Sequence, residues 1–173
     1  MPPPLILNPA SLDLNQVLVR KDAIRQVNPQ RFEMEQLDAI VLLDQEKELI
    51  VGYKDVHGDE FWVRGHMPGY PLLPGVLICE AAAQLAAYYI ATAGLLGGHF
   101  LGFGGLENVR FRGTVKPGDR LVLVGKAVRL NPRQPVVTVQ GFVGGTMVFQ
   151  GDIIGVPMQR EGNTGEQRAA RES

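Results

Sequence analysis

The sequence predicts an α+β domain in which an antiparallel sheet packs around one long, buried helix. The first observation is a stretch from Met67 to Leu106 in which Glu80 is the only fully charged residue. Within this stretch, Val76–Ala93 is rich in Ala and Leu and contains neither Gly nor Pro, as expected of a helix. The second observation is that apolar and polar residues alternate after Gly105, which is the period of half-buried antiparallel strands.

Composition narrows the class of protein before any motif is considered. The 173 residues suffice for one domain, and 45% hydrophobic with 20% charged residues excludes a disordered chain. A formal charge of −1 gives no general attraction to nucleic acid or to a membrane surface. Cys79 is the only cysteine, which excludes an internal disulfide framework and a Cys-rich zinc site. The N-terminal residues lack the pattern of a signal peptide, so we expect a cytoplasmic protein.

Before the long helix we expect an N-terminal segment, residues 1–30, and then the start of the sheet. Residues 1–10 are rich in proline and predict irregular chain, and the apolar spacing of Ser11–Val27 predicts an amphipathic helix. Two runs of β-forming residues, 39–44 and 48–56, flank a polar stretch and predict a hairpin. Phe61–Arg64 is a candidate for a short third strand.

The helix expected at Val76–Ala93 begins after Pro74 and Gly75 and would be about 27 Å long. This length is close to that of a membrane span, but the segment is built on Ala rather than Leu. Glu80 would also cost about 2.5–3.5 kcal/mol at the centre of a bilayer. We therefore expect no membrane span, and a helix buried on every side within the fold.

Four strand candidates follow the helix and are separated by turns rich in Gly, Pro and Asn: 106–115, 119–130, 135–143 and 146–156. We expect them to form a four-strand antiparallel meander. One long helix wrapped by a curved sheet is the shape called hot-dog. Residues 31–158 then make up the hot-dog domain, and the polar, aperiodic tail, 159–173, is predicted to be disordered.

Glu80 is the main candidate for chemistry, because it lies one turn into an apolar helix. Burial disfavours its charged form, whereas the partial positive charge of the helix N-terminus favours an anion there. The position suits a structural carboxylate and a functional one equally well. Gln84 follows four residues later on the same face, where its amide can donate to the carboxylate and orient it.

His66 and the start of the helix offer complementary groups. His66 stands in GHMPGYPLLPG, residues 65–75, whose prolines and glycines predict a tightly shaped loop. Histidine is a natural general base near neutral pH, although most isolated loop histidines have no catalytic role. The N–H groups of Gly75 and Val76 are free at the helix N-terminus and can stabilise a developing oxyanion. Together these groups fit proton removal α to a thioester or ketone carbonyl, coupled to loss or gain of a β-hydroxyl.

These residues also resemble a known family signature. The matching segments are Gly65–Gly69, Pro71, Leu73–Ile78, Glu80–Ala81 and Ala83–Gln84, which include the 14-residue interval from His66 to Glu80. They are similar to the β-hydroxyacyl-acyl carrier protein dehydratases of type II fatty acid synthesis, and most similar to the FabZ type. Weaker similarity extends over most of residues 20–157.

The resemblance implies a single hot-dog domain that forms a homodimer, and commonly a trimer of dimers. It implies that His66 of one chain faces Glu80 of the other, takes the α-proton, and leaves Glu80 to protonate the departing hydroxyl. Gly75 would hold the thioester carbonyl, Gln84 would orient Glu80, and no metal or organic cofactor would be used. The substrate would be a thioester of acyl carrier protein or coenzyme A, with its acyl chain in a tunnel between protomers. Candidates for the tunnel wall are Phe61, Met67, Pro68, Tyr88 and Phe103.

The chain departs from the family before the first strand. Pro29–Met34 replaces the usual Pro-His-Arg-Tyr-Pro-Phe stretch, and Glu35-Gln36 replaces an apolar pair. Met67 stands where the family has an aromatic residue in the loop. Glu80 stands where the FabA type has Asp, and this difference argues against a bifunctional dehydratase and isomerase. Two other functions stay open: a hot-dog acyl-thioester hydrolase that activates water, and a non-catalytic module that binds acyl groups.

Overall fold

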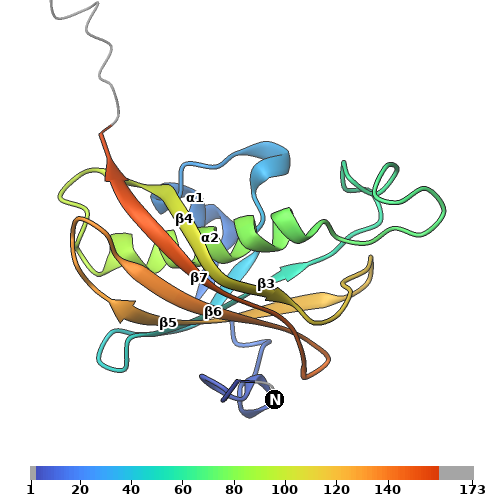
Figure 1. Ribbon diagram of the computed structural model, residues 1–173, viewed down its shortest axis with the longest axis horizontal. Helices are drawn as coiled ribbons and strands as arrows, with labels where there is room; N and C mark the ends of the chain where they lie inside the picture. The colour runs from blue at the N-terminus through green and yellow to red at the C-terminus, as the bar shows by residue number, and fades with distance from the viewer. Residues whose placement is uncertain (1–2, 160–173) are drawn as a thin grey trace, which may run out of the picture.

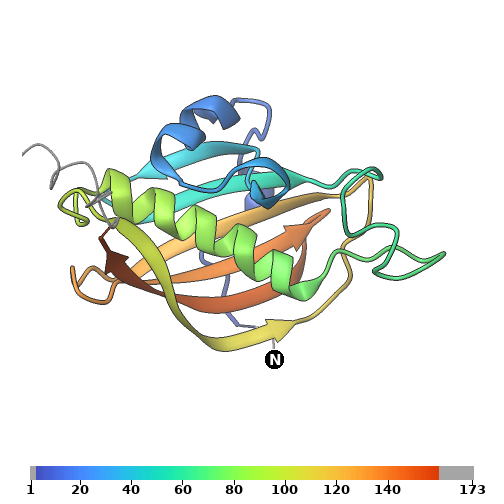
Figure 2. The ribbon, with the colours of Figure 1, turned by 90° about the horizontal axis from the view of Figure 1, so that it is seen from above.

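The computed structural model describes residues 3–159 of the chain. Within them, seven antiparallel strands form one curved sheet in the order β1-β2-β3-β5-β6-β7-β4, and the long helix α2 lies across its concave side (Figures 1 and 2). The strands are β1 Val19–Arg20, β2 Ala39–Asp44, β3 Leu49–Asp55, β4 Phe100–Phe111, β5 Arg120–Arg129, β6 Val136–Val143 and β7 Thr146–Met158. The helices are α1 Lys21–Val27 and α2 Gly75–Thr92, with 3-10 turns at Pro9–Ser11 and Phe32–Met34. This arrangement confirms the predicted hot-dog fold.

The helix α2 forms where the sequence predicts it, beginning and ending one residue earlier. Among the helices of residues 3–159 it alone is long and apolar enough to span a membrane, and 67% of it is buried inside the fold. Leu85 packs closely on the sheet because Gly52 of β3 has no side chain; a Cβ there would lie 3.0 Å from Leu85 Cδ1. The prediction of burial on every side was wrong at both ends of the helix, where Val76 is 76% exposed and Thr92 is also exposed.

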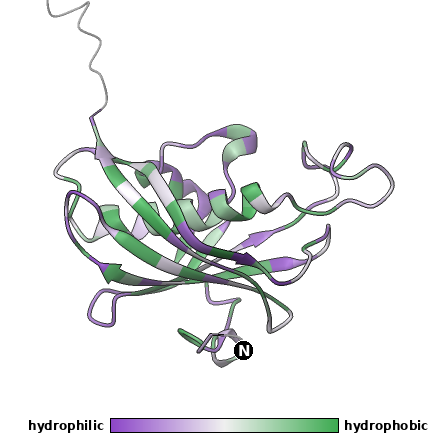
Figure 3. Cartoon of the chain, viewed as in Figure 1, coloured by the Kyte–Doolittle hydropathy of each residue, from purple (hydrophilic) through white to green (hydrophobic). Residues whose placement is uncertain are grey.

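The central strands are buried on both faces, which explains their long apolar runs. On β5, Leu121 and Leu123 belong to the core around α2, whereas Val122 and Val124 belong to a second apolar cluster on the outer face. Residues 4–17 cover this outer face and lie below the sheet in Figure 1. The buried Gln140 amide fastens them, because it accepts the Ile6 N–H and donates to Pro4 O, each at 2.9 Å. Figure 3 shows apolar residues along α2 and the strands beneath it.

The helix predicted at Ser11–Val27 was wrong over its first ten residues, and only Lys21–Val27 is helical. Asp13 instead closes a turn, in which its side chain accepts the Asn15 N–H at 3.0 Å. Of the apolar residues that suggested the helix, Leu14 and Val17 pack on the outer face of the sheet, and Val19 and Arg20 pair with β2 as β1. Long-range packing therefore overrides the helical spacing.

The short strand considered at Phe61–Arg64 was also wrong, because this stretch is a series of turns. The Val63 N–H bonds Glu60 O at 3.0 Å, and the His66 N–H bonds Trp62 O at 2.8 Å. Trp62, only 4% exposed, anchors the turns in the core. These local bonds are those of turns, and residues 61–64 pair with no strand of the described sheet.

The four C-terminal strands do not form one meander. The first runs over Phe100–Phe111 rather than 106–115, and it pairs with β7, whereas β5 pairs with β3. The reason is that α2 carries the chain across the sheet, so that β4 enters at the far edge and β5 returns beside β3. Only β5, β6 and β7 make a meander. The tail predicted to be disordered, 159–173, lies outside the described residues except for Gln159.

Candidate active site

Glu80 lies on the second turn of α2, where Gln84 holds it in one orientation. Gln84 Nε2 donates to Glu80 Oε1 at 2.8 Å and to Met34 O at 2.6 Å. The Gln84 amide cannot flip to exchange its oxygen and nitrogen, because Oε1 accepts a hydrogen bond from the Gln36 N–H at 2.9 Å. Gln84 is only 2% exposed, so these bonds are shielded from water. One oxygen of Glu80 is thereby fixed, and no bond from residues 3–159 to the other, Oε2, is found.

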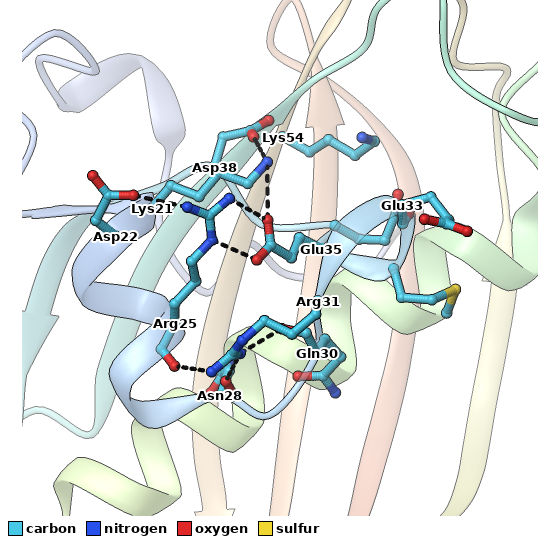
Figure 4. Close-up of polar contacts among 12 residues, drawn as sticks. Lys21, Asp22, Arg25, Asn28, Gln30, Arg31, Glu33, Glu35, Asp38 and Lys54 are labelled. Carbon is cyan, nitrogen blue, oxygen red and sulfur yellow. Dashed lines mark hydrogen bonds and ion pairs between the residues drawn. The ribbon is translucent and has the colours of Figure 1, made fainter.

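The segment that departs from the family, residues 29–36, and the preceding Asn28 are fastened to α2 by hydrogen bonds. Asn28, itself buried, donates to the backbone oxygen of Gln84 at 2.9 Å. Further along, Arg25 of α1 forms paired hydrogen bonds with Glu35 (Figure 4). The Arg25 guanidinium holds the pKa of Glu35 below its ordinary value, although burial opposes the shift. Glu35 therefore has a cationic partner, and the segment that carries it forms a wall beside Glu80.

A cavity of about 70 Å³ lies between α2, β4 and β7, and Glu80 lines it. Gln30 closes it from residues 28–36, and residues 101–103 and 153–155 close it from the two strands. Ala83 and Ala87 lie beside Glu80 on the same face of α2 and leave the space open. We call this cavity the Glu80 pocket; it is large enough for a few water molecules or for a short length of acyl chain.

His66 lies on the loop between β3 and α2, residues 56–74, which projects past the end of the sheet (Figures 1 and 2). Its Nδ1 is 2.7 Å from the backbone oxygen of Leu72. A carbonyl oxygen only accepts hydrogen bonds, so Nδ1 carries the proton, and in the neutral ring Nε2 has a free lone pair. The backbone N–H and C=O of His66 are bonded to Trp62 O and to the Leu72 N–H, each at 2.8 Å. The ring is therefore presented rigidly, with Nε2 able to accept a proton.

The start of α2 leaves N–H groups free. Pro74 is the cap residue and makes no side-chain bond to the first turn, so the N–H groups of Gly75 and Val76 have no partner within the helix. The ring of Phe111, at the end of β4, lies against Gly75, where an added Cβ would be 2.8 Å from Phe111 Cζ. Only glycine allows this close approach. The helix N-terminus can thus bind a carbonyl oxygen beside an exposed aromatic ring.

Within one chain, the predicted site residues form separate groups. Glu80 and Phe103 share the Glu80 pocket, with Gln84 behind them. His66 lies with Met67 and Pro68 on the projecting loop, and residues 3–159 show no hydrogen bond or ion pair between His66 and Glu80.

The other two candidates for a tunnel wall lie elsewhere. Tyr88 is in the core, where burial raises the pKa of its hydroxyl. Phe61 lines a different surface hollow, of about 460 Å³, together with Phe32.

Sequence reasoning did not place Gln30, Ala83 or Ala87 in the pocket. The two alanines could have been found, because they share with Glu80 and Gln84 the spacing of one helix face. Gln30 carried a weaker signal, since it stood out only as a departure from the family pattern.

Comparisons with known proteins give one consistent result. Residues 28–152 match the model of the FabA-like domain. The chain is 35% identical over 133 residues to 3-hydroxyacyl-[acyl-carrier-protein] dehydratase FabZ of Moorella thermoacetica, covering 77% of this chain and 92% of that protein. It is 36% identical over 124 residues to the FabZ of Bacillus subtilis, covering 69% and 87%.

Among solved structures, the dehydratase heterocomplex ApeI:P from Xenorhabdus doucetiae has a similar fold. Its TM-score is 0.67 at 13% identity, over 79% of this chain and 91% of that one. These comparisons confirm the family resemblance predicted from the sequence, and the solved structure adds support for the hot-dog fold.

Proposed function

The chain belongs to the FabA-like family, and on this basis we propose that it dehydrates 3-hydroxyacyl thioesters of acyl carrier protein in fatty acid biosynthesis. We assign the activity to residues 31–158. The observation that carries the assignment of residues is the Glu80 carboxylate, which Gln84 holds at the wall of a small pocket. Glu80 lies 14 residues after His66, whose Nε2 is free to act as a base.

In the proposed reaction, Nε2 of His66 takes the proton from C2 of the substrate, and the electron pair of that C–H bond forms the C2=C3 double bond. The C3–O bond breaks, and the leaving oxygen takes a proton from Glu80 and departs as water. The N–H groups of Gly75 and Val76 stabilise the thioester oxygen while it carries negative charge. Proton exchange with water then restores His66 and Glu80. The product is a trans-2-enoyl thioester.

We further propose that the site is completed by a second copy of the chain. β4 is a 12-residue strand at one edge of the sheet, and it exposes Phe103 and Phe111, at 50% and 51%, and Leu106 at 39%. Such an edge favours pairing with another strand. Pairing of two β4 strands would continue the sheet and bring the projecting loop, with His66, toward the Glu80 pocket of the partner subunit. A homodimer is the smallest unit that contains this site, and further assembly into a trimer of dimers stays a prediction.

The carrier protein is proposed to dock at the end of β4 near Gly75. Arg110 and Arg112 are exposed there and flank Phe111, which lies against Gly75. Arg120 is occupied by Asp55, with which it forms two hydrogen bonds. Arg110 and Arg112 donate to neutral oxygens and have no carboxylate partner among residues 3–159. An acidic carrier would therefore meet exposed cations beside the point where the thioester enters. A cytoplasmic location agrees with a single, buried cysteine and no disulfide requirement.

The test is interconversion of a trans-2-enoyl and a (3R)-hydroxyacyl thioester, each on acyl carrier protein and on coenzyme A. We expect the full chain to interconvert them, and His66→Ala to abolish the reaction while leaving the fold intact. Release of free thiol without interconversion would favour a hydrolase. Binding without either product would favour a non-catalytic module, and either result would overturn the proposal.

A further inference from the structure

The loop that carries His66 is held together by the side chain of Glu60. The two carboxylate oxygens bond different N–H groups of the loop: Oε1 accepts that of the His57 backbone and Oε2 that of the Trp62 indole, each at 2.9 Å. The backbone oxygen of Glu60 also accepts the Val63 N–H at 3.0 Å. One residue therefore fastens both the beginning of the loop and the turns that lead to His66.

Trp62 connects Glu60 to His66. Its ring is buried in the core around α2 and is only 4% exposed. Its backbone oxygen accepts the His66 N–H at 2.8 Å and the Gly65 N–H at 3.1 Å. The imidazole ring is in turn oriented by the bond from Nδ1 to Leu72 O, at 2.7 Å. A continuous path of hydrogen bonds thus runs from the Glu60 carboxylate through Trp62 to the ring of His66.

We propose that Glu60 is a positioning residue for the base of the reaction and acts on it through Trp62. This inference rests on the proposed function, in which Nε2 of His66 takes the proton from C2 of the substrate. Nε2 must then lie within hydrogen-bond reach of that proton, and an error of about 1 Å in such a contact can lower the rate by about 100-fold. Because Glu60 acts through other residues, it should affect kcat and leave KM unchanged.

Lys54 has a different role at the same carboxylate. Its ammonium group lies 2.9 Å from Glu60 Oε2 and neutralises the buried charge, and its side chain is 5% exposed. Lys54→Met should therefore weaken the fold but leave both oxygens of Glu60 as acceptors for the loop. Glu60→Gln leaves one acceptor oxygen and replaces the other by an NH2 group, so either the His57 or the Trp62 N–H would face a donor. The two variants break the same ion pair, but only Glu60→Gln disturbs the path to His66.

The test measures kcat, KM and urea unfolding for the full chain, for Glu60→Gln, for Lys54→Met and for the double variant. The reaction is hydration of a trans-2-enoyl thioester of acyl carrier protein to the (3R)-hydroxyacyl thioester. We expect Glu60→Gln to lower kcat by at least about tenfold, with KM unchanged. Lys54→Met is the matched control, because it should lose stability and still keep kcat near that of wild type.

The double variant separates positioning from stability. It should recover part of the stability, because no buried charge is left unpaired, whereas its kcat should stay as low as that of Glu60→Gln. If Glu60→Gln does not fold, the double variant is compared with Lys54→Met instead.

A kcat that recovers together with stability would indicate a structural role and would overturn the inference. An unchanged kcat in Glu60→Gln would overturn it too, as would a rise in KM alone or an equal loss of kcat in Lys54→Met. Failure of the proposed function gives a different result, since the wild-type chain itself would then not hydrate the enoyl thioester.

Discussion

Lys54 and Glu60 form a buried ion pair at the base of the loop that carries His66. Lys54 Nζ lies 2.9 Å from Glu60 Oε2, and the two side chains are 5% and 14% exposed. Glu60 also accepts the His57 N–H and the Trp62 indole N–H, each at 2.9 Å. One carboxylate thus neutralises a buried ammonium group and closes the turns that lead to His66.

The perturbation is Glu60→Gln, which keeps the shape and an acceptor but removes the charge. Breaking a buried ion pair from one side costs about 3–5 kcal/mol, because the remaining charge is left uncompensated. Since the amide still accepts a hydrogen bond, we expect a loss near 3 kcal/mol in the free energy of unfolding. Urea unfolding followed by tryptophan fluorescence measures it, because Trp62 is the only tryptophan and lies at this site.

The loss in the free energy of unfolding caused by Glu60→Gln should depend on pH. Burial alone would raise the pKa of Glu60, but hydrogen bonds from the His57 N–H, the Trp62 indole and Lys54 outweigh it, and the pKa is lowered. A carboxyl group whose pKa is lower in the folded chain stabilises the fold above its unfolded pKa, about 4.3, and loses that contribution as pH falls through the folded value. The difference in the free energy of unfolding between wild type and Glu60→Gln should therefore be largest at pH 7 and decrease below about pH 4.3.

Glu46→Ala is the control, because Glu46 is exposed in the turn between β2 and β3 and should change stability by less than about 0.5 kcal/mol. In a double variant, Lys54→Met with Glu60→Gln, removal of both charges should recover part of the loss. An unchanged urea midpoint for Glu60→Gln would contradict this role of the ion pair. So would a double variant whose loss in the free energy of unfolding exceeds the sum of the losses in Lys54→Met and Glu60→Gln.

Three further predictions concern the core, the thiol and the sheet edge. Leu85→Ala removes a fully buried side chain between α2 and the sheet and should lower stability by about 2–5 kcal/mol in urea unfolding. Burial raises the pKa of the Cys79 thiol, so iodoacetamide should alkylate the native chain at pH 8 far more slowly than the unfolded chain; similar rates would contradict this. Leu106→Glu on the free edge of β4 should yield a monomer in light scattering, whereas Val128→Glu, exposed on β5, should not.

Local sequence signals predicted most of the framework. The stretch at Val76–Ala93, with one charged residue and neither Gly nor Pro, identified α2 to within one residue. The hairpin of β2 and β3 followed from its two β-rich runs. The sequence could not show that residues 4–17 cover the outer face of the sheet, so the helix predicted at Ser11–Val27 began too early. It also could not show that α2 carries β4 to the far edge, because that depends on contacts between distant residues.

The candidate site was predictable only where spacing is local. Four residues separate Glu80 from Gln84, and the hydrogen bond that this spacing allows is present at 2.8 Å. The bond from His66 to Leu72 O depends on the course of a loop, which its prolines and glycines indicate but do not specify. The place of Gln30 in the wall of the Glu80 pocket depends on the packing of residues 28–36 against α2, which no local pattern shows. The roles of His66, Glu80, Gly75 and Gln84 in catalysis stay predictions.

We propose that His66 of one chain and Glu80 of another form one dehydratase site. Complementation tests it: His66→Ala and Glu80→Gln chains with different affinity tags are co-expressed, and the mixed dimer is purified through both tags. Each single variant alone should be inactive. The mixed dimer has one site with both groups intact, so its dehydratase activity should return to about half that of wild type. A mixed dimer without activity would contradict a shared site, and an active single variant would contradict the role given to its residue.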